Sequence, residues 1–180
     1  MRMTAAVLGG VGQKLQIDEV DLAPPRDGEV LVKVAASGLC ASDLDAIDGK
    51  RTLAPFPLVP GHEAAGVVTQ TGPRVSRLKV GDAVVVSIVP SCGDCPACVR
   101  GRRNYCEAAG RAMSRGGLLD GSLRLSRNGE PLHHFLTVSS FAQYAVVPES
   151  GAVAIDITTA SPTVSRVTRG PVCATTPAAS

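Results

Sequence analysis

The segment Glu-Val-Leu-Val-Lys-Val-Ala at residues 29–35 decides the fold class of this chain. Its three valines fall on one side of an extended backbone, and the leucine and lysine between them fall on the other, which is the period of a β-strand. The Asp27-Gly28 pair in front of it is typical of a tight turn. The segment therefore predicts a strand that opens from a turn.

Similar short apolar runs recur along the chain between turns rich in glycine and proline. They cover residues 4–8, 15–20, 64–69, 83–89 and 141–147. Many short strands of this kind predict a closed or sandwiched, mainly β architecture. A short helix is expected to begin near Ser42, with Asp45 completing a capping box, and residues 111–130 are expected to be irregular.

Composition narrows the class of protein. The 180 residues are 44% hydrophobic and 19% charged with a net charge of +2, which suits a globular chain with a core of ordinary size. No basic run alternates with aromatic residues, so nucleic acid is not an expected partner. No run approaches the roughly 20 apolar residues of a membrane span, and the apolar start is too short for a signal peptide. We expect a cytoplasmic protein without a membrane partner, in which thiols stay reduced.

A cluster of cysteines stands out in the middle of the chain. The spacing is C-x2-C-x2-C-x7-C, formed by Cys92, Cys95, Cys98 and Cys106. Four thiolates at short intervals, with turn-forming residues between them, are what a tetrahedral zinc ion needs. Two disulfides are the alternative, and the reducing compartment disfavours them. The cluster predicts a zinc site.

A second set of candidate ligands lies upstream. Cys40 and His62 are 22 residues apart, and each alone is more often a buried structural residue than a ligand. Their neighbours are polar: Ser42 and Asp43 follow the cysteine, and Glu63 follows the histidine. A carboxylate can accept the second ring proton of a metal-binding imidazole, and a hydroxyl can pass a proton to or from a bound alcohol. The set therefore suits a catalytic zinc with an open position.

These motifs resemble those of the zinc-dependent alcohol dehydrogenases, in the medium-chain dehydrogenase group. The run Gly61-His62-Glu63-x2-Gly66-x5-Gly72-x2-Val75 fits the catalytic-zinc signature of that family at every specified position. Residues 38–44 fit the segment with the first catalytic ligand, and the cysteine cluster fits the structural-zinc lobe. The resemblance covers residues 1–155. It implies a GroES-like β-barrel with short helices and a zinc lobe at residues 90–108.

The resemblance also implies a role for each candidate. Cys40 and His62 resemble catalytic zinc ligands, and Glu63 resembles an acidic alternate ligand beside the zinc. Ser42 resembles the hydroxyl of a proton relay, and Asp43 resembles the carboxylate that orients the histidine. The four clustered cysteines resemble the structural zinc ligands. The implied reaction is the reversible oxidation of an alcohol to an aldehyde by NAD(P).

The sequence departs from the family after the barrel. The chain shows no G-x-G-x-x-G pattern, so we expect it to lack the Rossmann domain and to stop before the nucleotide-binding half. Cys173 is the one candidate for a third catalytic ligand, although its context is one residue out of the family pattern. Sixteen of the last twenty-five residues, 156–180, are Ala, Ser, Thr or Pro, which predicts a disordered tail.

Three functions compete on this evidence. The first is the catalytic domain of an alcohol dehydrogenase, active only with a nucleotide-binding half; the partner expected is a second copy of the chain in a homo-oligomer, or a protein that supplies the nucleotide-binding domain. The second is a zinc-binding module without turnover, or a gene fragment. The third, a GroES-like structural protein, does not explain seven metal-ligand candidates.

Overall fold

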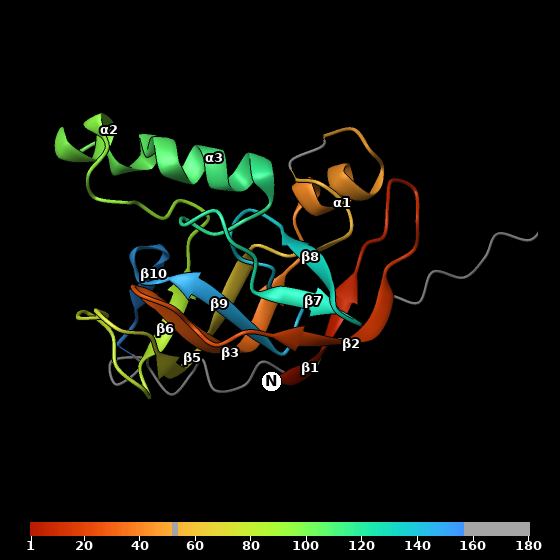
Figure 1. Cartoon of the computed structure of the whole chain (residues 1–180), viewed down its shortest axis with the longest axis horizontal. Coiled ribbons are helices and arrows are strands. Elements are labelled where there is room, and N and C mark those ends of the chain that lie inside the picture. The colour runs from red at the N-terminus through yellow and green to blue at the C-terminus, as the bar shows by residue number, and fades with distance from the viewer. Residues whose placement is uncertain (52–53, 157–180) are drawn as a thin grey trace, which may run out of the picture.

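The computed structural model describes residues 1–51 and 54–156. Two five-stranded sheets curl around one another, and the helices lie along one side of them (Figure 1). The first sheet has the order β1-β2-β7-β8-β4, and the second has the order β10-β6-β5-β3-β9. The predicted mainly β architecture is confirmed.

The strands are short, as expected. Those of the first sheet are β1 (Arg2–Val7), β2 (Gln16–Leu22), β4 (Leu58–Val59), β7 (Leu125–Arg127) and β8 (Glu130–His134). Those of the second are β3 (Glu29–Gly38), β5 (Glu63–Thr71), β6 (Ala83–Val86), β9 (Tyr144–Pro148) and β10 (Ala152–Ala154). The helices are α1 (Ala41–Ile47), α2 (Pro96–Val99) and α3 (Glu107–Arg115), with 3-10 turns η1 (Arg103–Tyr105) and η2 (Glu149–Gly151).

Most pairings are antiparallel and join strands far apart in sequence. Within residues 1–51 and 54–156, the two-residue match of β4 with β8 is the one parallel strand pair. Strand β3 is central, because it pairs with β5 on one side and with β9 on the other. This part of the chain therefore holds no parallel sheet of the Rossmann type.

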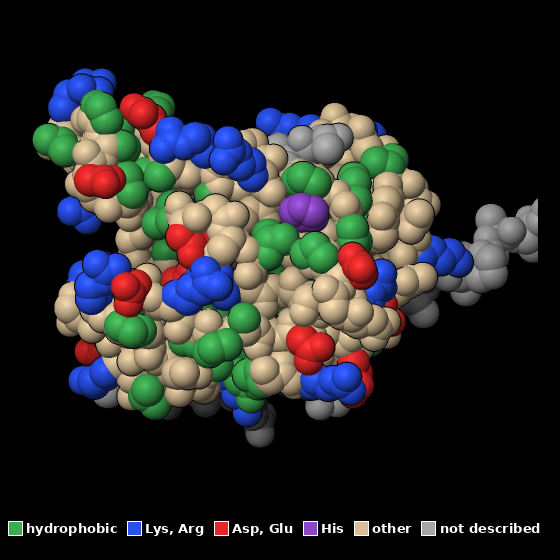
Figure 2. Space-filling view, viewed as in Figure 1, with side chains coloured by type: hydrophobic (Ala, Val, Ile, Leu, Met, Phe, Trp, Pro, Cys, Tyr) green, Lys and Arg blue, Asp and Glu red, His purple; other side chains and the backbone are tan. Residues whose placement is uncertain are grey.

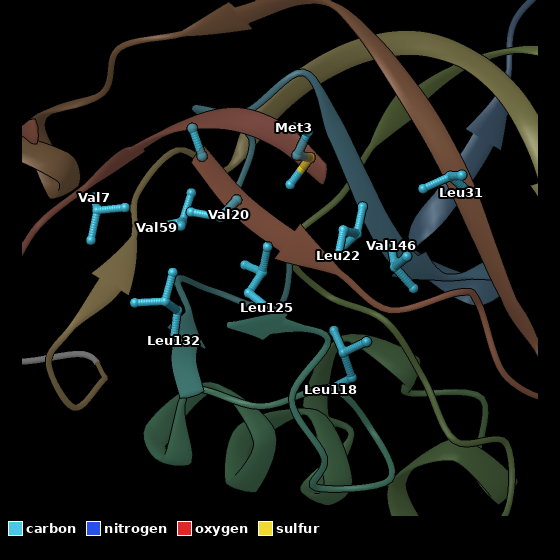
Figure 3. Close-up of a cluster of buried hydrophobic side chains, with 11 residues drawn as sticks. Met3, Val7, Val20, Leu22, Leu31, Val59, Leu118, Leu125, Leu132 and Val146 are labelled. Carbon is cyan, nitrogen blue, oxygen red and sulfur yellow. The ribbon is translucent and has the colours of Figure 1, made fainter. Parts of the chain in front are cut away.

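The alternating faces of the strands determine which side chains enter the core of each sheet. Val30 and Val32 on β3 are fully buried among aliphatic residues of the second sheet, whereas Leu31 points the other way and joins the core of the first sheet. Figure 3 shows the core of the first sheet, in which Val20 and Leu22 of β2 meet residues of β7, β8 and β9. The start of β3 is thus covered on both faces, and it ties the two sheets together.

Two local expectations are wrong. Residues 111–130 are not irregular throughout, because α3 extends to Arg115 and β7 lies within them. The helix expected near Ser42 is present as α1, but its cap lies two residues earlier than expected: Cys40 is the N-cap, and Asp43 completes the capping box. The buried carboxylate of Asp43 reaches back to the Cys40 N–H group, which places the cap there.

The expected tail at residues 156–180 lies outside the described residues, apart from Asp156. In the part of the chain that the structure describes, no helix is both long and apolar enough to span a bilayer.

Candidate metal centres

The cysteine cluster lies in a lobe that projects from the barrel. Helices α2 and α3 with η1 form this lobe, which stands at the upper left of Figures 1 and 2. Pro96 opens α2 at a position that favours proline, and Gly116 ends α3 in a left-handed conformation with φ 65°. Between the cysteines, Gly93 and Gly101 turn the chain with φ of 88° and 76°, so that four sulfurs from one short stretch converge.

The four sulfurs have the spacing of a metal site. Their Sγ atoms all lie within 4.8 Å of one another. Cys92 Sγ lies 4.0 Å from Cys98 Sγ and 3.5 Å from Cys106 Sγ. A tetrahedron built on the usual zinc–sulfur distance of about 2.3 Å has edges of about 3.8 Å, which lies between these two values. These two separations therefore suit a tetrahedral zinc site.

The cysteines of the cluster are not positioned to form disulfide bonds. All five described cysteines are free, and the sulfur separations are far longer than the roughly 2.05 Å of an S–S bond. The alternative of two disulfides at the cluster finds no support in the geometry.

Backbone N–H groups point at the sulfurs. Those of Cys98 and Glu107 lower the pKa of the Cys95 thiol to about 6. The Cys92 N–H donates to Cys106 Sγ at 3.3 Å. Against this, a hydrogen bond with the Asp94 carboxylate raises the pKa of Cys92 to about 12. Four thiolates held this close together repel one another, so ionising all four thiols costs free energy unless a cation lies between them. A divalent metal ion supplies that charge.

A second cluster brings together residues from two segments. Cys40 precedes α1, His62 ends a loop, and Glu63 begins β5; one ligand atom from each lies within 4.8 Å of the others. The imidazole is buried, the thiol is half-buried and the carboxylate is exposed. The structure thus brings together the three residues that the sequence analysis proposed as one site.

Asp43 joins the two segments that supply the cysteine and the histidine. Its carboxylate is fully buried and accepts hydrogen bonds from the N–H groups of Cys40 at 3.0 Å and Gly61 at 2.9 Å. Asp43 Oδ1 also lies 3.4 Å from His62 Nδ1, in a contact that is not a hydrogen bond. The carboxylate therefore holds both backbones and stands beside the ring nitrogen.

The hydroxyl of Ser42 lies on the other side of the imidazole. Ser42 Oγ is 3.2 Å from His62 Nε2, and the serine is half-buried. Phe135 packs the edge of its ring against His62, with ring centroids 5.6 Å apart at 66°. One nitrogen of the ring faces a carboxylate and the other faces a hydroxyl, so the imidazole has a fixed orientation against the ring of Phe135.

The donor set of this second cluster suits zinc with an open position. A thiolate, an imidazole and a carboxylate are all ordinary zinc ligands, and three protein ligands are typical of catalytic rather than structural sites. Because the Asp43 carboxylate stands beside His62 Nδ1, the nitrogen that such an ion would take is Nε2. Cys173, the other proposed ligand, lies outside the described residues.

Sequence reasoning missed two residues beside this cluster. Ser37 Oγ and Ser140 Oγ are 2.7 Å apart, and Ser37 Oγ donates to the carbonyl of Glu63 at 3.0 Å. The two serines are 103 residues apart in the chain, so no local pattern joins them. Only the pairing of β3 with β5 and the return of the chain before β9 bring them together.

Comparison with known proteins identifies the family to which this fold belongs. Residues 26–157, more than half of the chain, match the family model of the alcohol dehydrogenase GroES-like domain. The chain belongs to the alcohol dehydrogenase family. The GroES-like fold expected for it is thereby confirmed, and the two clusters described above lie within the matched range.

Relatives of this alcohol dehydrogenase domain include both curated proteins and solved structures. S-(hydroxymethyl)glutathione dehydrogenase of Escherichia coli is 42% identical over 149 residues, which cover 83% of this chain. The alcohol dehydrogenase zinc-binding domain protein of Burkholderia ambifaria is 40% identical with a TM-score of 0.80, and benzyl alcohol dehydrogenase of Acinetobacter calcoaceticus is 36% identical with a TM-score of 0.77. Each of the two solved structures matches 87% of this chain, and the match covers 42% of the solved chain. The chain spans 40% of the length of the curated relative.

Proposed function

We propose that this chain supplies the zinc-binding, catalytic half of an NAD(P)-dependent alcohol dehydrogenase. The observation that carries the proposal is the convergence of Cys40, His62 and Glu63 beside the hydroxyl of Ser42. Family membership and the names of the similar proteins support the same reaction class, the interconversion of an alcohol and an aldehyde.

In this proposal the two clusters have different tasks. The four cysteines hold a structural zinc that fixes the lobe, because four thiolates leave no coordination position for a substrate. Cys40, His62 and Glu63 hold a second zinc, which when bound supplies a Lewis acid that makes the hydroxyl of an alcohol more acidic.

The residues around the second cluster move and place the proton. Asp43 fixes the ring of His62 and the start of α1 through its two backbone hydrogen bonds. Ser42 Oγ, beside the imidazole and half-open to solvent, accepts the proton that leaves the alcohol and returns its own to water. Phe135, which is fully buried, keeps water away from the inner side of the imidazole.

The hydride acceptor must come from elsewhere. We find no dinucleotide-binding motif in the sequence, and the similar proteins are longer than this chain. We propose that a nucleotide-binding domain outside these 180 residues presents the nicotinamide to the second cluster. The chain by itself is then expected to bind alcohol but to show no turnover.

Binding of an alcohol tests this function against the alternative of an inactive zinc-binding module. Zinc-loaded protein is titrated with benzyl alcohol, and contact is measured by saturation-transfer NMR. The proposal expects contact that disappears in Cys40→Ser and survives in the matched surface variant Ser126→Ala. Equal signals from the three proteins would favour the inactive module.

A further inference from the structure

The backbone at residues 136–139 is strained. Leu136, Thr137 and Ser139 have φ of 51°, 63° and 61°, in the left-handed region that side chains rarely adopt. Thr137 is β-branched, and its buried hydroxyl has no hydrogen-bond partner among the described residues. Such a conformation persists only where the surroundings hold it, and it is most often found at functional sites.

The strained turn closes on Phe135. The carbonyl of Phe135 accepts hydrogen bonds from the N–H groups of Val138 at 3.1 Å and Ser139 at 3.3 Å. Its own N–H group donates to Ser139 Oγ at 3.0 Å. The turn therefore fixes the backbone of the residue whose ring packs against His62.

The chain that leaves the turn clamps the segment before His62. The N–H group of Ser140 donates to the Gly61 carbonyl at 2.9 Å, and that of Phe141 donates to the Pro60 carbonyl at 3.0 Å. Gly61 has φ 87°, and a side chain there would collide with the Phe141 ring and the Ser140 hydroxyl. The close approach of the two segments thus depends on this glycine.

A pair of hydroxyls holds the segment after His62. Ser37 Oγ donates its one proton to the Glu63 carbonyl, so the 2.7 Å contact with Ser140 must be a hydrogen bond that Ser140 donates. Ser140 is 1% exposed, and its backbone N–H already holds Gly61. Ser140 therefore fixes the chain on both sides of His62, directly on one side and through Ser37 on the other.

We propose that Ser37 and Ser140, held in place by the left-handed turn at residues 136–139, position the His62 imidazole for metal binding. They touch neither the ion nor the substrate, and they act through the backbone on either side of the histidine. The inference rests on the proposed function, because it assigns a metal to the cluster of Cys40, His62 and Glu63. Residues that hydrogen-bond directly to metal ligands contribute about 10- to 100-fold to metal affinity, and we expect the lower end of that range for residues that act through the backbone.

Cobalt(II) titration of the full chain tests the positioning role. The absorption bands of the two sites differ, because one has four thiolates and the other has one. The four-cysteine site of the same molecule then reports folding, while the second site reports positioning. Ser37→Ala, Ser140→Ala and the double variant are compared with Ser126→Ala, which removes a serine hydroxyl from β7 in the other sheet.

We expect each single variant to weaken cobalt binding at the second site about tenfold, and the double variant to weaken it little further, because the two hydroxyls form one chain. Affinity at the four-cysteine site and the behaviour of Ser126→Ala should not change. Unchanged affinity at the second site in Ser37→Ala and Ser140→Ala would overturn the inference, as would an equal loss at both sites. A wild-type protein that binds one equivalent of cobalt would instead contradict the proposed function.

Discussion

The two metal clusters are built in opposite ways. All four sulfurs of the lobe come from one stretch, residues 92–106, whose turns and short helices bring them together locally. The second cluster draws on the start of α1 and the start of β5, and it lies beside two hydrogen-bonded serines that are 103 residues apart. A closed structural site can be encoded locally, whereas an open site needs the barrel to place its ligands and to leave one side free.

The largest expected difference between the clusters concerns stability. Cys98→Ser should release one zinc and lower the free energy of unfolding by more than about 4 kcal/mol, because binding energy at a structural zinc is folding energy. Denaturant unfolding monitored by circular dichroism measures this. Cys40→Ser is the matched control and should cost about 1 kcal/mol or less, because two aliphatic cores hold the barrel around the second site. Similar losses in both variants would remove the distinction.

Acid should weaken the barrel that the second cluster depends on. Burial, with the charge of Arg124 nearby, lowers the pKa of His134 from 6.5 to about 3. Below about pH 6.5 the unfolded chain binds a proton at this histidine, whereas the folded chain does not. The free energy of unfolding therefore falls as the pH drops from 6.5 towards 3, by roughly 3–5 kcal/mol. Unfolding measured across this range should show the loss.

The control for the acid experiment keeps the hydrogen bond and removes the titration. His134 Nε2 accepts from the N–H group of Arg124 at 3.1 Å, and a glutamine carbonyl can accept in its place. His134→Gln should therefore show a flatter pH dependence than the wild type between pH 6.5 and 3. Parallel curves would mean that the acid effect comes from other groups.

A change at Asp43 should weaken metal binding at the second cluster alone, without unfolding the chain. Asp43→Asn keeps the shape of the side chain, but one oxygen that accepts an N–H group becomes an NH₂ donor that faces a donor. Metal affinity at the second cluster should fall about 10- to 100-fold, with no change at the four cysteines. Competition with a chromophoric chelator measures both affinities, and an equal loss at both would point to general destabilisation.

The smallest expected effect tests the exposed ligand. The side chain of Glu63 lies over Gly38, where an added Cβ would collide with the carboxylate end. Gly38→Ala should displace this flexible side chain and weaken the second site by a few-fold, or by about 1 kcal/mol. Gly110→Ala, on α3 where a Cβ meets open space, is the control and should leave it unchanged.

Local patterns predicted the parts of the molecule that local chemistry determines. The alternation at residues 29–35 gave the position of β3, and the spacing of the cysteines was enough to propose the lobe site. Helix α3 was missed because it has a glycine in the middle and few large apolar residues. Its buried face consists of Ala109 and Ala112, which need a neighbouring surface to be informative.

Other parts of the second cluster had no local signal. The sequence placed the helix cap at Ser42, because a serine hydroxyl is a common cap, but the buried Asp43 carboxylate makes Cys40 the cap. The pairing of Ser37 with Ser140 depends on a β-sheet register between distant strands, and the left-handed turn at residues 136–139 contains no glycine to announce it.

The zinc content of the purified chain tests the central claim most directly. The account predicts two zinc ions per chain by elemental analysis, one in Cys40→Ser and one in Cys98→Ser, with different ions lost in the two variants. One zinc per wild-type chain, unchanged in Cys40→Ser, would contradict a metal centre at Cys40, His62 and Glu63.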